Sequence, residues 1–222
     1  MKKLAFAALA SGHLMGTAHP ADQIVSDPVV DVAAAAHDWN GFYAGVLGGY
    51  GAGTTTFVSG GATQNLGTSG WLLGVTAGYN HQWDMFVLGV EGDIAWSNIG
   101  GSAPLVTTPA LTLSSNASWI GTLRGRAGVA VDQALLYVTA GFAAAGVNST
   151  LTAPGGSFSA THTGWTAGAG IEYAVTDDWS VKAEYAYTAL NTVTAPAATL
   201  APAAVNISPS FHAVKIGANF HF

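Results

Sequence analysis

Residues 212–222, HAVKIGANFHF, alternate strictly between two kinds of side chain. One row is apolar and ends in two aromatic rings: Val214, Ile216, Ala218, Phe220 and Phe222. The other row is small or polar, as in Lys215, Asn219 and His221. Because successive side chains of a β-strand point to opposite faces, this alternation predicts a strand with one apolar face and one polar face.

The same alternation recurs upstream and predicts eight strands in all. It is clear in residues 71–82, 86–96, 119–131, 165–173 and 179–187, and weaker in 40–50 and 135–145, where both faces are rich in Gly and Ala. Each segment approaches the length of about 9–11 residues that a strand needs to cross a bilayer.

The composition favours a membrane over water as the surroundings of these strands. Half of the residues are hydrophobic and only 8% are charged, whereas a soluble domain carries about 25% charged residues. No run in the mature chain reaches the roughly 20 apolar residues of a membrane helix, and 29 glycines disfavour helix. A closed antiparallel barrel is then the remaining way to satisfy every backbone group in lipid.

The N-terminus predicts export. Lys2 and Lys3 precede an apolar run that ends near Met15 and is followed by small residues up to Ala18, the pattern of a cleavable secretory signal. We therefore expect a signal peptide at 1–18, a periplasmic lead-in at 19–38 and a barrel domain at 39–222.

The predicted connections alternate in length. Short links fall near 81–85, 132–134 and 176–178, and long segments rich in Gly, Ser, Thr, Ala and Pro fall near 51–69, 97–117, 148–161 and 189–210. Short periplasmic turns and longer external loops are typical of outer-membrane barrels. The even strand count then places both chain ends on the periplasmic side.

Alternation alone also fits a soluble ligand-binding barrel with its apolar face inward. The scarcity of charges and the aromatic ends of the apolar rows favour the membrane barrel, whose apolar face meets lipid. Every strand charge then points into the lumen, where four acids and four bases form an expected ion-pair network: Glu91, Asp93, Arg124, Arg126, Glu172, Lys182, Glu184 and Lys215. Arg124 and Arg126 should meet Glu91 and Asp93 of the preceding strand.

No catalytic or metal site is expected. The pair Glu91 and Asp93 suits acid–base chemistry, but we interpret it as a structural partner of facing bases. The serines cluster in predicted loops, no Ser/His/acid set shares a strand face, and the histidines show no metal-ligand spacing. The absence of cysteine excludes disulfides and thiolate chemistry, and the net charge of −6 excludes a basic nucleic-acid surface.

Several segments resemble the outer-membrane immunogenic protein/porin family of alphaproteobacteria, within the OmpA-like eight-stranded barrels. These are WNGFYAGVLGGY (39–50), WIGTLRGRAG (119–128), YVTAGFA (137–143), GWTAGAGIEYAVTDDWSVKAEY (164–185) and the Phe-terminated last strand. The resemblance implies residence in the outer membrane of a Gram-negative bacterium, among lipid and lipopolysaccharide. A terminal aromatic, Phe222, resembles the signal by which bacterial barrels are recognised by the outer-membrane assembly machinery.

The family resemblance leaves three roles open. Eight strands give an interior that side chains can just fill, so we favour a closed barrel with a structural or surface-interaction role and a lumen plugged by charges. The alternatives are a small porin-like channel and, by family analogy, a surface haem or ligand receptor with His162 or His212 as ligand. External ligands would bind through the loops. A wall-anchoring role is not expected, since no further domain follows Phe222.

Overall fold

The computed structural model describes residues 37–105, 108–152, 156–200 and 203–222. The predicted signal peptide, and the lead-in before His37, lie outside these residues. The elements are β1 (Gly41–Ser59), β2 (Ala62–Trp83), β3 (Phe86–Leu105), β4 (Thr108–Val131), β5 (Ala134–Leu151), β6 (Gly156–Ala174), β7 (Trp179–Leu190), β8 (Val193–Ala195) and β9 (Val205–His221). Within the described part of the chain, no helix is long and apolar enough to cross a membrane.

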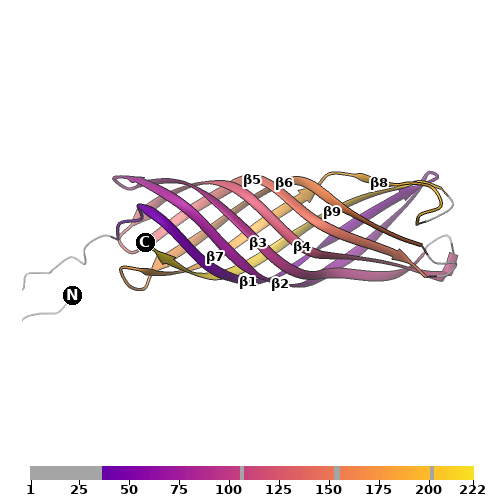
Figure 1. The fold of residues 1–222 in the computed structure, drawn as a ribbon, viewed down its shortest axis with the longest axis horizontal. Helices are drawn as coiled ribbons and strands as arrows, with labels where there is room; N and C mark the ends of the chain where they lie inside the picture. The colour runs from indigo at the N-terminus through magenta and orange to yellow at the C-terminus, as the bar shows by residue number, and fades with distance from the viewer. Residues whose placement is uncertain (1–36, 106–107, 153–155, 201–202) are drawn as a thin grey trace, which may run out of the picture. The chain divides into compact units, whose positions relative to one another are not determined.

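Eight of these strands close a ring, as the alternation predicts. Each of β1–β7 pairs antiparallel with its neighbour in sequence, β7 pairs with β9, and β9 pairs back with β1. The ninth element, β8, is a three-residue strand within the β7–β9 connection that pairs with the start of β9. Figure 1 shows the tilted strands and the C-terminus at one end of the barrel.

The two ends of the barrel differ. At the end that we call the turn end, β2–β3 and β4–β5 are joined by two-residue turns that begin with Asp84 and Asp132. Both aspartates adopt a positive φ, 58° and 53°, which Asp tolerates better than most residues. At the opposite end, the hairpin end, the connections are β1–β2, β3–β4, β5–β6 and the longer β7–β9.

The expectation of long loops is wrong at three of these connections. Much of 51–69, 97–117 and 148–161 extends the strands, so that β1 and β2 pair without interruption from Gly41↔Asn80 to Ser59↔Ala62. The β1–β2 turn contains only Gly60 and Gly61, with φ of 57° and 84°. Only the β7–β9 connection remains a long excursion. The extensions lacked clear alternation in sequence because polar residues occupy many positions on both faces.

The outer face carries the apolar belt that the sequence predicts. Large apolar side chains remain exposed there, among them Val46, Val75, Val90, Leu123, Val138, Val181 and Ile216. Exposed aromatic residues bound the belt, as Phe42 and Tyr50 do in β1 and Phe86 and Trp96 do in β3. These intervals match the strand of about 9–11 residues that crosses a bilayer. No Asp, Glu, Lys or Arg occurs on the hairpin-end side of the aromatic boundary that includes Tyr50 and Trp96. The uncharged segments there are residues 51–70, 97–118, 145–164 and 188–213.

A β-bulge in β4 marks the start of these extensions. The pairing of β4 shifts by one residue at Ser118 on both sides: Ser118 is the extra residue against β5, whereas against β3 it stands opposite two residues, Ser97 and Asn98. A bulge reverses which sequence positions face inward. On the turn-end side of the bulge, even-numbered positions of β4 such as Ile120 point inward. On the hairpin-end side, odd-numbered positions such as Leu113 point inward.

Candidate functional site: the barrel interior

The eight predicted strand charges all point into the barrel and form one layer near the turn-end half of the lumen. Their side chains are buried, from fully covered Arg126, Glu91 and Glu172 to Lys215, which retains 11% exposure. The four carboxylates are Glu91, Asp93, Glu172 and Glu184, and the four cations are Arg124, Arg126, Lys182 and Lys215. Formal neutrality limits the cost of burying so many charges, because each charge has a partner.

Arg124 is the centre of this charged layer. Its Nη2 donates to Glu91 Oε1 at 2.5 Å and to Asp93 Oδ2 at 2.9 Å. Glu91 pairs with Arg124 in the β3–β4 register, so the structure brings these residues together as the sequence suggests. Nη1 donates to Glu184 of β7 at 2.6 Å, a contact across the lumen that strand order alone does not indicate.

Arg126 turns to the other wall of the barrel. Its guanidinium pairs with Glu172 of β6, while Glu91 lies 3.9 Å from its Nη1. The guanidinium carbon lies 3.9 Å from the ring centre of Tyr137. The Tyr43 hydroxyl donates a hydrogen bond to Glu91 Oε2 at 2.8 Å. Arg126 therefore contacts Glu172 and Tyr137 rather than Asp93.

The two lysines complete the charged layer. Lys182 donates to Glu91 Oε2 at 2.6 Å. Lys215 Nζ lies 2.6 Å from Glu184 Oε1 and 3.6 Å from Asp93 Oδ2. The result is a single network in which each carboxylate lies within ion-pair distance of a cation.

Inward-facing glycines make room for these long side chains. Six of the eight charged residues stand directly opposite a glycine of a neighbouring strand: Glu91–Gly78, Arg124–Gly141, Arg126–Gly89, Lys182–Gly217, Glu184–Gly170 and Lys215–Gly49. A Cβ added at Gly141 would lie 2.6 Å from Arg124 Cα and 2.1 Å from the Leu123 carbonyl oxygen. The glycine content of the chain thus has a specific packing role in a narrow lumen.

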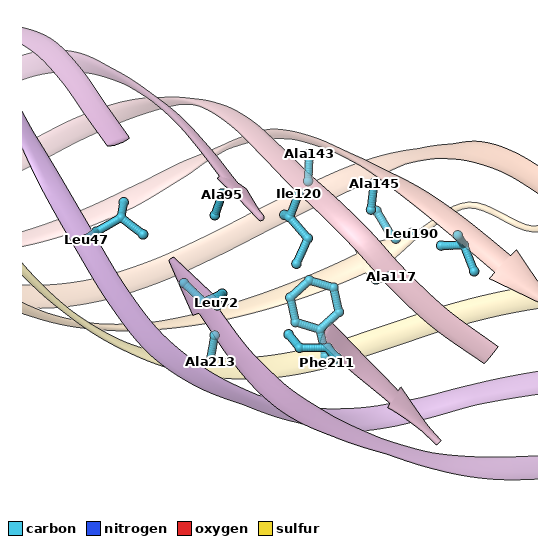
Figure 2. Close-up of a cluster of buried hydrophobic side chains, with 12 residues drawn as sticks. Leu47, Leu72, Ala95, Ala117, Ile120, Ala143, Ala145, Leu190, Phe211 and Ala213 are labelled. Atoms are coloured by element: carbon cyan, nitrogen blue, oxygen red, sulfur yellow. The ribbon is translucent and has the colours of Figure 1, made fainter. Parts of the chain in front are cut away.

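An apolar layer lies above the charged layer, toward the hairpin end. Its larger side chains come from five strands, β1, β2, β4, β7 and β9, and are drawn in Figure 2: Leu47, Leu72, Ile120, Leu190 and Phe211. This layer was not predicted, because the inward rows were interpreted as polar or small. The signal was present in isolated inward Leu, Ile and Phe residues, but these stand out only when the closed ring brings them into one buried cluster.

A second apolar cluster fills the hairpin end. The cluster joins Ala195 and Leu200 of the β7–β9 connection and Val205 at the start of β9 to five residues of the strand extensions: Phe57, Leu66, Leu113, Leu151 and Ile207. Leu200 is buried there. The β7–β9 connection therefore covers the hairpin end of the lumen.

The turn end is filled by a residue that precedes β1. Trp39 is fully buried and packs with Val87, Leu135, Tyr137 and Ala174. Its backbone N–H donates to Gln82 Oε1 at 2.8 Å. The sequence placed Trp39 at the start of the barrel domain but gave no reason to expect it inside the lumen.

Three residues of the turn end have the side-chain types of a hydrolase triad. Ser180 Oγ lies 3.0 Å from His221 Nε2 and 2.5 Å from Glu172 Oε1. Their proximity is not visible in the sequence, because they come from three strands, β7, β9 and β6. In a serine hydrolase the histidine takes the serine proton and the acid orients the histidine. Here the serine donates to the acid, and all three side chains are buried, so the contacts satisfy buried polar groups.

The two histidines considered as haem ligands lie in strands rather than near loop ends, and on opposite faces. His162 points into the barrel, is buried, and its Nδ1 lies 3.1 Å from the Asn191 carbonyl oxygen. His212 faces outward, and its Nδ1 lies 2.5 Å from the Tyr185 hydroxyl. Among the described residues, no group of three or more His, Cys, Asp or Glu could hold a metal ion.

Two internal cavities are small. One, of about 20 Å³, lies between the charged and apolar layers and is lined by Asp93, Lys215 and Phe211 among others. The other, of about 10 Å³, lies higher, beside Thr55 and Ser115. A site of this size holds about one water molecule. A larger hollow, of about 610 Å³, lies among apolar residues such as Val46 and Ile216 of the membrane-facing surface, where lipid would fill it.

The sequence and the fold match known outer-membrane proteins. Residues 28–222 match the family model "Outer membrane protein beta-barrel domain". The chain is 35% identical to the 31 kDa outer-membrane immunogenic protein of Brucella melitensis, with all of both chains covered. It is 33% identical to the 25 kDa outer-membrane immunogenic protein of Brucella abortus, covering 85% of this chain and 84% of that one.

A solved structure shares the fold. The outer membrane protease OmpT from Escherichia coli superimposes with a TM-score of 0.52 at 9% identity, over 84% of this chain and 98% of that one. At this identity the likeness concerns the barrel fold alone.

Proposed function

Since the chain belongs to the outer-membrane β-barrel protein family, we propose that it is a closed barrel that anchors uncharged hairpins at the cell surface and conducts no ions. The barrel resides in the outer membrane, surrounded by lipid and lipopolysaccharide. Its relatives are named as immunogenic proteins, which fits hairpins exposed to the outside of the cell.

The observation that carries this proposal is the continuous filling of the lumen. Trp39 occupies the turn end, the charged layer follows, and two apolar clusters lead to Leu200 beneath the hairpin end. An ion crossing this interior would have to displace buried ion pairs and then pass an apolar layer without hydration, and hydrophobic constrictions stop conduction by dewetting. The interior is therefore plugged by apolar packing as well as by charges.

The orientation rests on the difference between the two ends. Short turns belong in the periplasm and longer hairpins outside. Asp38, Asp84, Asp132, Asp177 and Asp178 all lie at the turn end, so the acidic connections would face the periplasm. The hairpins, with no charged residue, would cross the lipopolysaccharide layer without attracting its ions.

Epitope tags test this orientation. A tag between Gly60 and Gly61 should bind antibody on intact cells, since this turn has open space around both residues. A tag between Asp132 and Gln133 should bind antibody only after the outer membrane is permeabilised. The opposite labelling would overturn the orientation.

Planar-bilayer recording of the refolded protein tests the closed lumen. We expect no steady conductance at neutral pH, and a steady, ion-selective current in the wild type would favour the porin-like alternative. The double variant Leu190→Ala with Phe211→Ala tests the role of the apolar layer, because both side chains belong to it. If the apolar layer blocks ions, this double variant should conduct while the wild type does not.

A further inference from the structure

Four residues before β1, His37–Asn40, cross the turn end of the lumen, and we call them the strap. Asn40 Oδ1 accepts a hydrogen bond from the Gln82 N–H at 2.7 Å, and Asp38 Oδ1 accepts one from the Asn40 N–H at 3.0 Å. At the other end of the strap, the His37 N–H donates to the Asp132 carbonyl oxygen at 3.1 Å. The strap is thus fastened to β2 on one side and to the β4–β5 turn on the other.

Trp39 of the strap fills the turn end of the lumen. Its indole is fully buried against β3, β5 and β6, and its ring centre lies 4.6 Å from that of His37 and 5.6 Å from that of His221. Its Nε1 and His37 Nε2 are buried without a hydrogen-bond partner in the described structure. An unpaired buried donor weakens a contact that is otherwise large and apolar, so the strap is held less firmly than its buried area suggests.

The imidazole of His37, in the strap, meets the imidazole of His221, in β9, edge to face. The ring centres of His37 and His221 are 5.7 Å apart. The other charged groups around His37 are Asp38 of the strap, Asp177 of the β6–β7 connection and Glu172 of β6, while Asp132 contributes its carbonyl oxygen from the β4–β5 turn. His221 Nε2 lies 3.6 Å from Glu172 Oε1 of β6 and 3.0 Å from Ser180 Oγ of β7, and the ring of Tyr43 in β1 lies 5.6 Å from the His221 ring between centres.

The docked strap disfavours a charge on His37. Burial lowers the pKa of His37 from its usual value of 6.5, and the charge on His221 acts in the same direction, against weaker opposing effects of Asp177, Asp38 and Glu172. A histidine whose pKa is lowered in the docked state binds its proton more tightly when released. Docking is therefore fully stable above about pH 6.5 and weakens as the pH falls below it.

The geometry points to a pH-operated cover: at mildly acidic pH, His37 gains a proton, its charge is unfavourable in the buried contact with Trp39 and His221, and the strap releases Trp39 from the turn end of the lumen. His221 stays in β9 beside Glu172, and the strap is the part that moves. Release uncovers the charged layer to the periplasm. The apolar layer above it is not involved, so release opens the turn end without making a pore.

Fluorine NMR of refolded protein containing 5-fluorotryptophan measures this release, with the Trp39 signal assigned through Trp39→Phe. The difference in chemical shift between H₂O and D₂O reports water contact of the ring. We expect almost no difference for Trp39 at pH 8 and a growing one below about pH 6.5, while the other tryptophans keep theirs. In His37→Gln, Trp39 should remain without water contact at pH 5.

His81→Gln is the matched control, because His81 also lies near the turn end and contacts an indole, that of Trp83 at 4.2 Å between ring centres, but takes no part in the strap. It should behave as the wild type. The proposal is overturned if Trp39 shows no water contact down to pH 5, or if it already shows water contact at pH 8. It is also overturned if the signals of all tryptophans change together, as in global unfolding. Conductance at neutral pH tests the closed barrel separately, so the two ideas can fail independently.

Discussion

Arg124 holds three carboxylates at once, and no other residue of the charged layer has as many ion-pair partners within 3 Å. Removing it leaves Asp93 with only Lys215, at 3.6 Å, and gives the layer a net charge of −1. Breaking a buried ion pair from one side costs about 3–5 kcal/mol, since the remaining charge is uncompensated. We expect Arg124→Ala to lower the free energy of unfolding by about this amount, measured by urea unfolding in detergent micelles and by mobility on unheated gels.

A second substitution separates charge from packing at this residue. Arg124→Ala with Asp93→Asn restores neutrality, so it should recover part of the lost stability although the side-chain volume is still missing. Glu91→Ala in place of Asp93→Asn should rescue less, because Glu91 is also paired with Lys182 at 2.6 Å. Equal stability of Arg124→Ala and wild type would show that water, not protein, satisfies these carboxylates.

Within an element, the pairing of charged residues with glycines explains how a narrow lumen holds eight long side chains. Glycine in a strand interior is ordinarily unfavourable, by about 0.5–1 kcal/mol relative to alanine, so a valine should help wherever there is space. At Gly141 of β5 there is none, because an added Cβ meets the backbone beside Arg124. We expect Gly141→Val to destabilise the barrel by about 1–3 kcal/mol through overpacking.

Gly125 of β4 provides the matched comparison. It faces outward, and an added Cβ would lie 3.8 Å from the Ala140 carbonyl oxygen, an ordinary contact. Gly125→Val should leave the urea midpoint unchanged or raise it. If both valine variants lose stability equally, the glycines serve strand flexibility rather than the charged layer.

For the whole molecule, we expect insertion into the membrane to depend on the end of the chain more than on the folded core. Phe222 is 78% exposed at the turn end, and its N–H donates to the Phe42 carbonyl oxygen at 3.0 Å. Phe222→Ala retains that backbone bond and loses an exposed ring together with its contact to the Phe220 ring, 5.1 Å away between centres. We expect normal stability of the refolded protein but a reduced yield in the outer membrane of cells, because the terminal ring would be read by the assembly machinery.

Phe42→Ala is the control for this prediction. Phe42 is a similarly exposed ring of the same end, at 65%, but it is not terminal. Fractionated membranes of the two variants, compared by immunoblot, should show a loss only for Phe222→Ala. Equal yields would mean that Phe222 is merely one member of the aromatic belt.

The number of strands, the face that meets lipid and the inward position of all eight charged residues were predictable from sequence. The period of two is a local property of each strand, and a charge facing lipid is too costly to occur there, so these assignments need no knowledge of distant contacts. The resemblance of the chain to a barrel family agrees with the family model that it matches.

Only the tertiary structure decided which residues meet across the lumen and how far the strands continue. Arg126 contacts Glu172 instead of Asp93, and Arg124 contacts Glu184. Both ion pairs form because closure of the ring brings strands that are not neighbours in the sheet within reach of long side chains. Residues 51–59 and 62–70 are strand because Phe57 and Leu66 pack in a shared apolar cluster that forms only when the barrel closes. Trp39 enters the lumen for the same reason: its burial depends on three strands that are distant in sequence, and no local pattern records that arrangement.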